Sequence, residues 1–233
     1  MSSGVNVFTR FLRTVLGALL GIAGSLALLA IADPNYGKLL LLAQTRYGTK
    51  AEQTVKSWQE MMRAAESMSE VDKVKRVNEF FNRVIQFGED QAIWGENDYW
   101  ATPLELMGRG IGDCEDFAIA KYFALRSLNV PNERLRITYV KARIGGPRSD
   151  VMQAHMILGY YEDPAGDPVI LDNLITEVRP ATRRGDLMPI FSFNSEGLWT
   201  GAGPAEKKDT SSSTARLSRW RDLIARMQAE GYE

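Results

Sequence analysis

The stretch Gly112-Asp113-Cys114-Glu115-Asp116, which continues as FAIAKYFALRSL to residue 128, decides the fold that this sequence predicts. Apolar residues cover most of the circumference of the predicted helix 115–128, which indicates burial on several sides. Asn129-Val130-Pro131 predicts where that helix ends. Cys114 is the only cysteine of the chain and stands where the helix begins, a position that favours the thiolate form. We therefore expect a central helix whose first turn carries a candidate nucleophile.

Two amphipathic helices are predicted before this stretch, over residues 51–67 and 70–87. Apolar residues recur in both at intervals of three and four, the spacing of one helix face, so both should pack on the core. The connection 88–112 is rich in Gly, Asp, Asn and aromatic residues, and a connection of this length is unusual unless it is functional. Its Trp94, Tyr99 and Trp100 either line a substrate cleft or cover the edge of the core.

Beyond the central helix the apolar pattern changes to a period of two, which predicts strands. Residues 134–143 and 153–161 form two predicted strands joined by the turn 144–150. Residues 169–172 form a shorter one after the turn 163–168. A helical half followed by an antiparallel sheet predicts the α+β fold class.

The only histidine, His155, lies in the second predicted strand, and Asp172 lies at the end of the third. Cys, then His, then Asp is an order that thiol-dependent acyl-transfer enzymes use. In such a triad Cys114 attacks, His155 pairs with the thiolate and protonates the leaving amine, and Asp172 fixes the tautomer of the ring. Each residue also has a structural interpretation: an inert buried thiol, a hydrogen-bonded core histidine and a turn-capping carboxylate. The joint order and the place of the cysteine favour the triad.

Three carboxylates crowd the candidate nucleophile: Asp113, Glu115 and Asp116. Their charge disfavours the thiolate, and a bound cation would reverse that effect. Hard oxygen ligands spaced this closely suit Ca²⁺ rather than zinc, and Asn97 and Asp98 could complete its shell. The alternative is that the acids only cap the helix and complement its dipole.

Residues 1–32 have the outline of a secretory signal peptide. They carry no acidic side chain, and an apolar run over 14–32 ends in the small-x-small sequence Ala30-Ile31-Ala32. An uncleaved membrane anchor is the alternative, because the 19 apolar residues nearly span a bilayer. The single domain expected over residues 33–200 should therefore lie outside the cytoplasm. Residues 201–233 should form a linker and an amphipathic helix over 216–229, which docks on the domain more readily than on a membrane or partner.

Composition excludes several other classes of protein. The net charge is −1 and no basic stripe is present, so no nucleic-acid partner is expected. One cysteine forbids an intramolecular disulfide, and with one histidine it excludes the usual structural zinc sites. No glycine-rich phosphate loop of the Rossmann or Walker kind occurs.

The motifs around Cys114 and the two strand residues resemble a known family, the bacterial transglutaminase-like cysteine proteinases. The resemblance covers roughly residues 35–200 and is most specific in the Asp-Cys-Glu-Asp block. The residues that carry it are Trp94-Gly95, Tyr99-Trp100-Ala101-Thr102-Pro103, Gly110 and Gly112 to Tyr122, Ala154-His155-Met156 and Leu171-Asp172-Asn173.

The resemblance implies a papain/transglutaminase-like fold, with a helical N-terminal half and the nucleophile at a helix N-terminus packed on an antiparallel sheet. It implies a triad carried by Cys114, His155 and Asp172, and calcium at Asp113, Glu115 and Asp116. It also implies a periplasmic location and a very large surface adhesin as substrate, cut in its N-terminal region so that the adhesin is released and a biofilm disperses. The implied partner is an inner-membrane, LapD-like receptor for cyclic di-GMP that sequesters the protease.

Taken together, these features predict a periplasmic, calcium-dependent cysteine endopeptidase. Two alternatives stay open at the level of the sequence. A transglutaminase-type acyl transferase shares the thioester intermediate, so the residues alone do not separate it from a protease. A catalytically inert module of the same fold could keep the cleft only to bind a peptide.

Overall fold

The computed structural model describes residues 34–200 and 214–232 of the chain. The predicted signal peptide or anchor lies outside the described residues, as does the predicted linker up to residue 213. Within the two described ranges, no helix combines the length and the apolar character that crossing a membrane requires.

Three helices come first in the described part of the chain, and the second and third fall where the spacing of apolar residues predicts them. The helices are α2 (Tyr36–Tyr47), α3 (Thr49–Ala65) and α4 (Glu70–Val84). Ser69 caps α4, because its hydroxyl accepts a hydrogen bond from the N–H of Asp72. The prediction ran the third helix to residue 87, but the chain is already extended at Ile85 and enters strand β1 (Gln86–Phe87). α2 was not predicted.

The segment expected as one long connection contains two short helices and a strand. They are α5 (Asp90–Ile93), α6 (Pro103–Arg109) and β2 (Ile111–Gly112), and β2 pairs in parallel with β1. The start of α6 is explained by a capping box: Thr102 and Glu105 satisfy each other's backbone N–H groups, and Pro103 stands at the first helical position. This local signal is visible in the sequence as Thr-Pro-Leu-Glu, and the prediction missed it.

The C-terminal half forms a six-stranded sheet with the order β6-β5-β4-β3-β7-β8, in which every neighbouring pair is antiparallel. Two 3-10 turns, η1 (Asn132–Arg134) and η2 (Ala181–Arg183), interrupt the chain around it. The predicted strands are β3, β4 and β5, the first three along the chain, and β6, β7 and β8 were not predicted. The strands are β3 (Leu135–Arg143), β4 (Met152–Tyr160), β5 (Val169–Leu171), β6 (Arg179–Pro180), β7 (Leu187–Phe193) and β8 (Leu198–Thr200).

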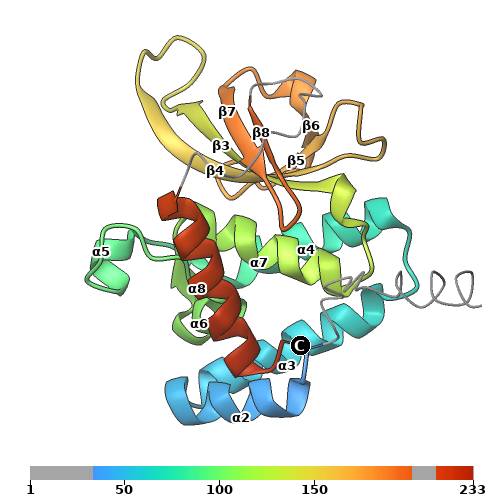
Figure 1. The fold of residues 1–233 in the computed structure, drawn as a ribbon, viewed down its shortest axis with the longest axis vertical. Helices are drawn as coiled ribbons and strands as arrows, with labels where there is room; N and C mark the ends of the chain where they lie inside the picture. The colour runs from blue at the N-terminus through green and yellow to red at the C-terminus, as the bar shows by residue number, and fades with distance from the viewer. Residues whose placement is uncertain (1–33, 201–213, 233) are drawn as a thin grey trace, which may run out of the picture. The chain divides into compact units, whose positions relative to one another are not determined.

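Helix α7 (Cys114–Ser127) lies at the centre of the core, as predicted from the apolar residues that cover most of its circumference. Figure 1 shows it next to the sheet, with α4 beside it and α2 and α3 on the side away from the sheet. Phe117, Ile119, Phe123 and Leu125 are all buried along it. The α+β fold class is confirmed, with the nucleophile-bearing helix packed on an antiparallel sheet.

Helix α8 (Thr214–Glu230) contains the predicted C-terminal helix and packs on the domain. Leu223 and Met227 are buried in the main core. The indole of Trp220 stacks on Phe123 with ring centroids 5.5 Å apart and also meets the ring of Trp100. In Figure 1 this helix crosses the helical layer and its C-terminal end lies near α2.

Candidate active site

Cys114 is the first residue of α7 and is partly buried. Two residues before it, Gly112 has no room for a side chain, because a Cβ there would collide with Leu106 and Asp116. Asp113 and Asp116 form a capping box that sets the first turn of the helix. The thiol is therefore fixed at the helix N-terminus, next to backbone N–H groups that an α-helix leaves without an intrahelical acceptor.

His155 and Asp172 are brought together by the register of two neighbouring strands. β4 and β5 pair with Leu158 opposite Leu171, so His155 in β4 lies near Asp172, which directly follows β5. Nε2 of the imidazole lies 2.7 Å from Oδ1 of the carboxylate, and both side chains are buried. The contact leaves the other ring nitrogen, Nδ1, available to a second partner.

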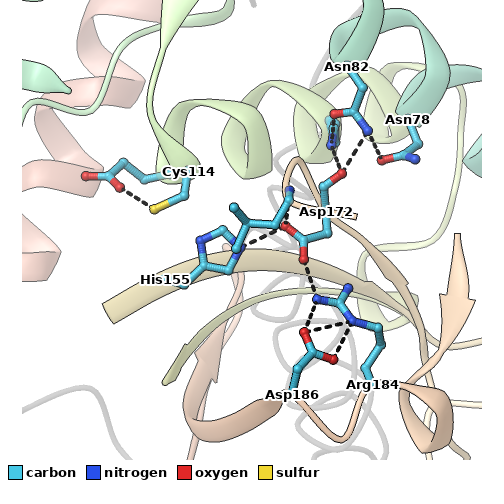
Figure 2. Close-up of polar contacts among 10 residues, drawn as sticks. Asn78, Asn82, Cys114, His155, Asp172, Arg184 and Asp186 are labelled. Atoms are coloured by element: carbon cyan, nitrogen blue, oxygen red, sulfur yellow. Dashed lines mark hydrogen bonds and ion pairs between the residues drawn. The ribbon is translucent and has the colours of Figure 1, made fainter. Parts of the chain in front are cut away.

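Cys114 and His155 line one cleft, with a volume of about 350 Å³. Trp100, Tyr139 and Phe191 contribute aromatic walls to this cleft, and Arg219 of α8 also lines it. Trp100 thus fits both predicted alternatives, because it is buried in the core and also lines the cleft. In Figure 2 the thiol sulfur is directed toward a carboxylate, and this contact is the 3.1 Å hydrogen bond from Sγ to Oε2 of Glu115.

Asp172 is held by hydrogen bonds at each of its three oxygens. Its backbone carbonyl accepts from Asn82 of α4 at 2.7 Å and from Lys121 of α7 at 3.2 Å. Oδ1 also accepts from the backbone N–H of Leu174, and Oδ2 accepts from Arg184 at 2.7 Å. Burial alone would raise the pKa of Asp172, but the hydrogen bonds and charges of His155 and Arg184 outweigh burial and lower this pKa to about 2. The carboxylate is therefore ionised at neutral pH.

The thiol of Cys114 has the opposite environment. Burial raises its pKa most, and the charges of Glu115 and Asp113 raise it further. The protein groups around Cys114, taken without a metal ion, therefore favour the neutral thiol over the thiolate. The sequence predicts the same effect, because carboxylates flank the nucleophile on both sides and their charge disfavours the thiolate.

The three predicted metal ligands lie in two overlapping groups of ligand atoms. Asp113 and Glu115 form one group with the thiol of Cys114, and Asp113 and Asp116 form the other with Asp90. The atoms of each group lie within 4.8 Å of one another. Glu115 belongs only to the group that contains the thiol, whereas Asp113 belongs to both.

Asp90 is the member of this cluster that the sequence prediction missed. It begins α5 and is buried, and its Oδ2 accepts a hydrogen bond from the N–H of Tyr99 at 2.5 Å. Two residues further along, the N–H of Ala101 donates to Oδ1 of Asp116 at 2.8 Å. One short segment of backbone thus orients both carboxylates. Asp90 itself ends the run Gly88-Glu89-Asp90, and this sequence looks like that of an ordinary loop.

The cluster fits a hard divalent cation. Oδ1 of Asp90 and Oδ1 of Asp113 are both buried, with no hydrogen-bond partner among the described residues. Burial is the main effect that raises the pKa of Asp90 to about 6, and it also raises the pKa values of Asp113 and Asp116. Buried carboxylates with unpartnered oxygens are a donor set that calcium prefers.

The two residues suggested as completing the metal shell lie at the same cleft as Cys114 and Glu115. Asn97 and Asp98 both line it, and Asp98 forms an ion pair with Arg219 at 3.0 Å. The carboxylate of Asp98 does not belong to the two groups of clustered ligand atoms, and Asn97 as a ligand stays a prediction. Arg219 and Arg184 are further residues of the site that sequence reasoning did not find. Both are charged residues without a motif, and only their contacts identify them.

Comparison with known proteins gives one family and several closely similar structures. The family model described as bacterial transglutaminase-like cysteine proteinase (BTLCP) matches residues 42–187. EGTA-treated Legionella pneumophila LapG is 34% identical with a TM-score of 0.70, and the match covers 84% of this chain and 98% of that one. Calcium-bound Legionella pneumophila LapG is 35% identical with a TM-score of 0.68, over 82% of this chain and 98% of that one. No match is found among curated proteins.

Proposed function

Because this chain belongs to the family of bacterial transglutaminase-like cysteine proteinases, we propose that it is a calcium-dependent endopeptidase with the triad Cys114, His155 and Asp172. The observation that carries the proposal is one arrangement of residues. The only cysteine begins a buried helix and shares a cleft with the only histidine. That histidine in turn lies 2.7 Å from a buried, ionised aspartate.

The chemistry of peptide cleavage follows from this arrangement. An ionised carboxylate can only accept hydrogen bonds, so Asp172 keeps the proton of the ring on Nε2 and leaves Nδ1 as the base. Nδ1 takes the thiol proton, and Sγ of Cys114 then attacks the peptide carbonyl. N–H groups in the first turn of α7 stabilise the negative oxygen that forms.

Collapse of this intermediate breaks the carbon–nitrogen bond. The proton on Nδ1 of His155 passes to the leaving amine, and a thioester with Cys114 remains. Water then attacks the thioester and gives a proton to Nδ1, which restores the thiolate and releases the acid. Asp172 stabilises the imidazolium in both halves of the cycle.

Calcium is proposed as the cation of this site, held by Asp113, Glu115 and Asp116 with Asp90 as an additional ligand. The unpartnered, buried oxygens of Asp90 and Asp113 support this ligand set. A bound calcium ion supplies positive charge beside the nucleophile and thereby favours the thiolate. The solved structure of the calcium-bound relative supports the choice of metal.

The substrate, the location and the partner are proposed from the family resemblance and from the leader. We infer a periplasmic enzyme that cuts the N-terminal region of a large surface adhesin, releases it from the outer membrane and so disperses a biofilm. An inner-membrane, LapD-like cyclic di-GMP receptor is the proposed partner that sequesters the protease. The signal-like pattern of residues 1–32 supports export.

The direct test is incubation of the full chain with N-terminal fragments of such an adhesin, with calcium or with EGTA, followed by mass spectrometry of the products. We expect one or a few cuts that need calcium and disappear in Cys114→Ala and in His155→Ala. Cleavage by either alanine variant would contradict the triad.

The same reactions, supplied with a primary amine, separate the alternative functions. Hydrolysed backbone supports the protease, whereas amine joined to glutamine side chains would identify an acyl transferase. A chain that binds the fragment but alters no bond would be the inert module.

A further inference from the structure

We propose that Arg184 is a positioning residue that fixes the carboxylate of Asp172, and through it the ring of His155. The inference rests on the proposed function, because it takes His155 as the acid and base of the cleavage reaction. Figure 2 shows Arg184 and Asp186 across Asp172 from the helix that carries Cys114. The family resemblance that identified the triad gives no role to Arg184.

Four side chains form one continuous chain of charge-assisted hydrogen bonds. Nε2 of His155 meets Oδ1 of Asp172 at 2.7 Å, and Oδ2 of Asp172 accepts from Nη2 of Arg184 at 2.7 Å. The guanidinium then binds Asp186 through Nε at 2.9 Å and through the same Nη2 at 2.8 Å. The side chains of Asp172 and Arg184 are almost completely buried, with exposed fractions of 0% and 1%.

The guanidinium is fixed before it reaches Asp172. Asp186 engages two of its nitrogens, which sets the plane of the group and directs Nη2 at Asp172. The backbone is fixed as well: the N–H of Arg184 donates to Ala181, which closes the 3-10 turn η2. Lysine has no planar fork, so it could neutralise Asp172 but could not be oriented by Asp186 in the same way.

Stability alone does not explain a buried arginine at this place. A buried ion pair adds little stability compared with a well-packed apolar group, because two charges must leave water. Nη1 of Arg184 is also buried, with no hydrogen-bond partner among the described residues. Orientation of Asp172 explains the arrangement, since a carboxylate that is hydrogen-bonded at both oxygens cannot turn away from the imidazole.

Other charged groups near Asp172 do not replace Arg184. Lys121 of α7 reaches only the backbone carbonyl of Asp172, and Asn82 binds the same atom. The N–H of Leu174 donates to Oδ1, the oxygen that also meets His155. Among the described residues, Arg184 is thus the one that donates a hydrogen bond to Oδ2 of Asp172.

The experiment uses the Nε2–H proton of His155 as its readout, observed by NMR in the untagged, ¹⁵N-labelled full chain with calcium. Because the chain contains one histidine, the imidazole signals need no assignment. In the parent chain we expect a downfield Nε2–H signal that exchanges slowly with water. In Arg184→Met we expect exchange to be faster by about tenfold or more, the factor that corresponds to one charge-assisted hydrogen bond.

Arg183→Met is the matched control, because Arg183 is the exposed neighbour of Arg184 and its loss changes the net charge equally. It should keep the parental exchange rate. Arg184→Lys should give an intermediate rate, since it keeps the charge and loses the fork. A folded Arg184→Met chain with the parental rate would overturn the proposal. If Arg184→Met does not fold, Arg184→Lys decides in its place, because parental protection there also overturns it.

Cleavage of the adhesin fragment supplies a second readout. In Arg184→Met we expect kcat/KM to fall about ten- to hundredfold, as when an orienting hydrogen-bond partner is lost. A parent chain that cleaves nothing would reject the proposed protease and leave the NMR comparison intact. A cleaving parent whose Arg184→Met variant keeps both its rate and its protected proton would reject only the positioning role.

Discussion

At the scale of single residues, the reactivity of Cys114 is set by the carboxylates around it. The thiol donates to Glu115, and burial together with Glu115 and Asp113 raises its pKa. An unassisted thiol in this place is a poor nucleophile at neutral pH. The same carboxylates are the proposed calcium ligands, so occupancy by the metal and reactivity of the thiol should change together.

Calcium should therefore accelerate alkylation of Cys114. Each unit by which a thiol pKa falls toward neutral pH increases the thiolate fraction about tenfold, so we expect a rise of at least about tenfold in rate with iodoacetamide. Mass spectrometry of the intact chain measures the reaction directly, because there is one cysteine. Equal rates in calcium and in EGTA would contradict the link between the metal and the thiol.

Asp90 should be a calcium ligand although it lies 24 residues before Cys114 in the sequence. Substitution Asp90→Asn removes one of the clustered carboxylates and should weaken calcium binding by about tenfold or more, since charge count tunes such sites. Titration calorimetry measures the affinity. Asp98→Asn is the matched control, because Asp98 pairs with Arg219 and lies outside the cluster. Equal affinities in the two variants would exclude Asp90 from the site.

At the scale of elements, segments that lie far apart in the chain build the cleft. α7 supplies the thiol, β4 supplies the imidazole and α8 supplies Arg219. α8 also fastens the segment that orients the acidic cluster. Arg226 donates to the hydroxyl of Tyr99 at 3.0 Å and to the carbonyl of Trp100 at 2.7 Å, and it forms an ion pair with Glu105.

Loss of Arg226 should loosen this attachment. Arg226→Met leaves Glu105 buried without its ion-pair partner, and we expect unfolding to become easier by about 2 kcal/mol, reduced from a fully buried pair because Arg226 is partly exposed. Urea unfolding followed by circular dichroism measures the change. Gln228→Met, on an exposed position of the same helix, should stay near the parent. The attachment would be unimportant if both variants unfolded at the same urea concentration.

At the scale of the whole molecule, a net charge of −1 conceals a strongly uneven distribution of charge. Asp90, Asp113 and Asp116 lie together and buried at one end of α7. Their mutual repulsion and desolvation oppose folding when all are ionised. A bound divalent cation removes this penalty, so the stability of the domain should depend on calcium and on pH at once.

In the absence of calcium, the domain should become more stable as the pH is lowered from 7 to about 5. The folded-state pKa of Asp90 is raised from 3.8 to about 6, and those of Asp113 and Asp116 are also raised, so the folded chain binds protons more tightly than the unfolded chain. The corresponding stability is present at low pH and is lost as the pH rises through the folded-state pKa.

For Asp90 alone we expect a contribution of about 1 to 2 kcal/mol between these two pH values. Thermal unfolding in EGTA across this range measures it, and saturating calcium should remove or reverse the trend. A calcium-free domain that is more stable at pH 7 than at pH 5 would contradict the raised pKa values.

Much of the fold followed from local pattern. The period of 3.6 located α3, α4, α7 and α8, the period of two located β3 and β4, and the turn signal of residues 163–168 marked the start of the short β5. Short elements were missed because two or three residues cannot show a period, which is the case for β6 and β8. The capping box of α6 was present in the sequence but lay inside a segment treated as a connection.

The sequence by itself determined which atoms could act as nucleophile and base, because it offers one thiol and one imidazole. It also placed Asp172 beside His155, since two strands joined by a short turn pair in antiparallel register. Only the tertiary structure decided that Asp90 joins the acidic cluster, that Arg184 holds Asp172 and that Arg219 enters the cleft. These residues lie in a loop, at the start of a short helix or on a remote helix, where charge carries no periodic signal. Their meeting depends on how distant segments pack.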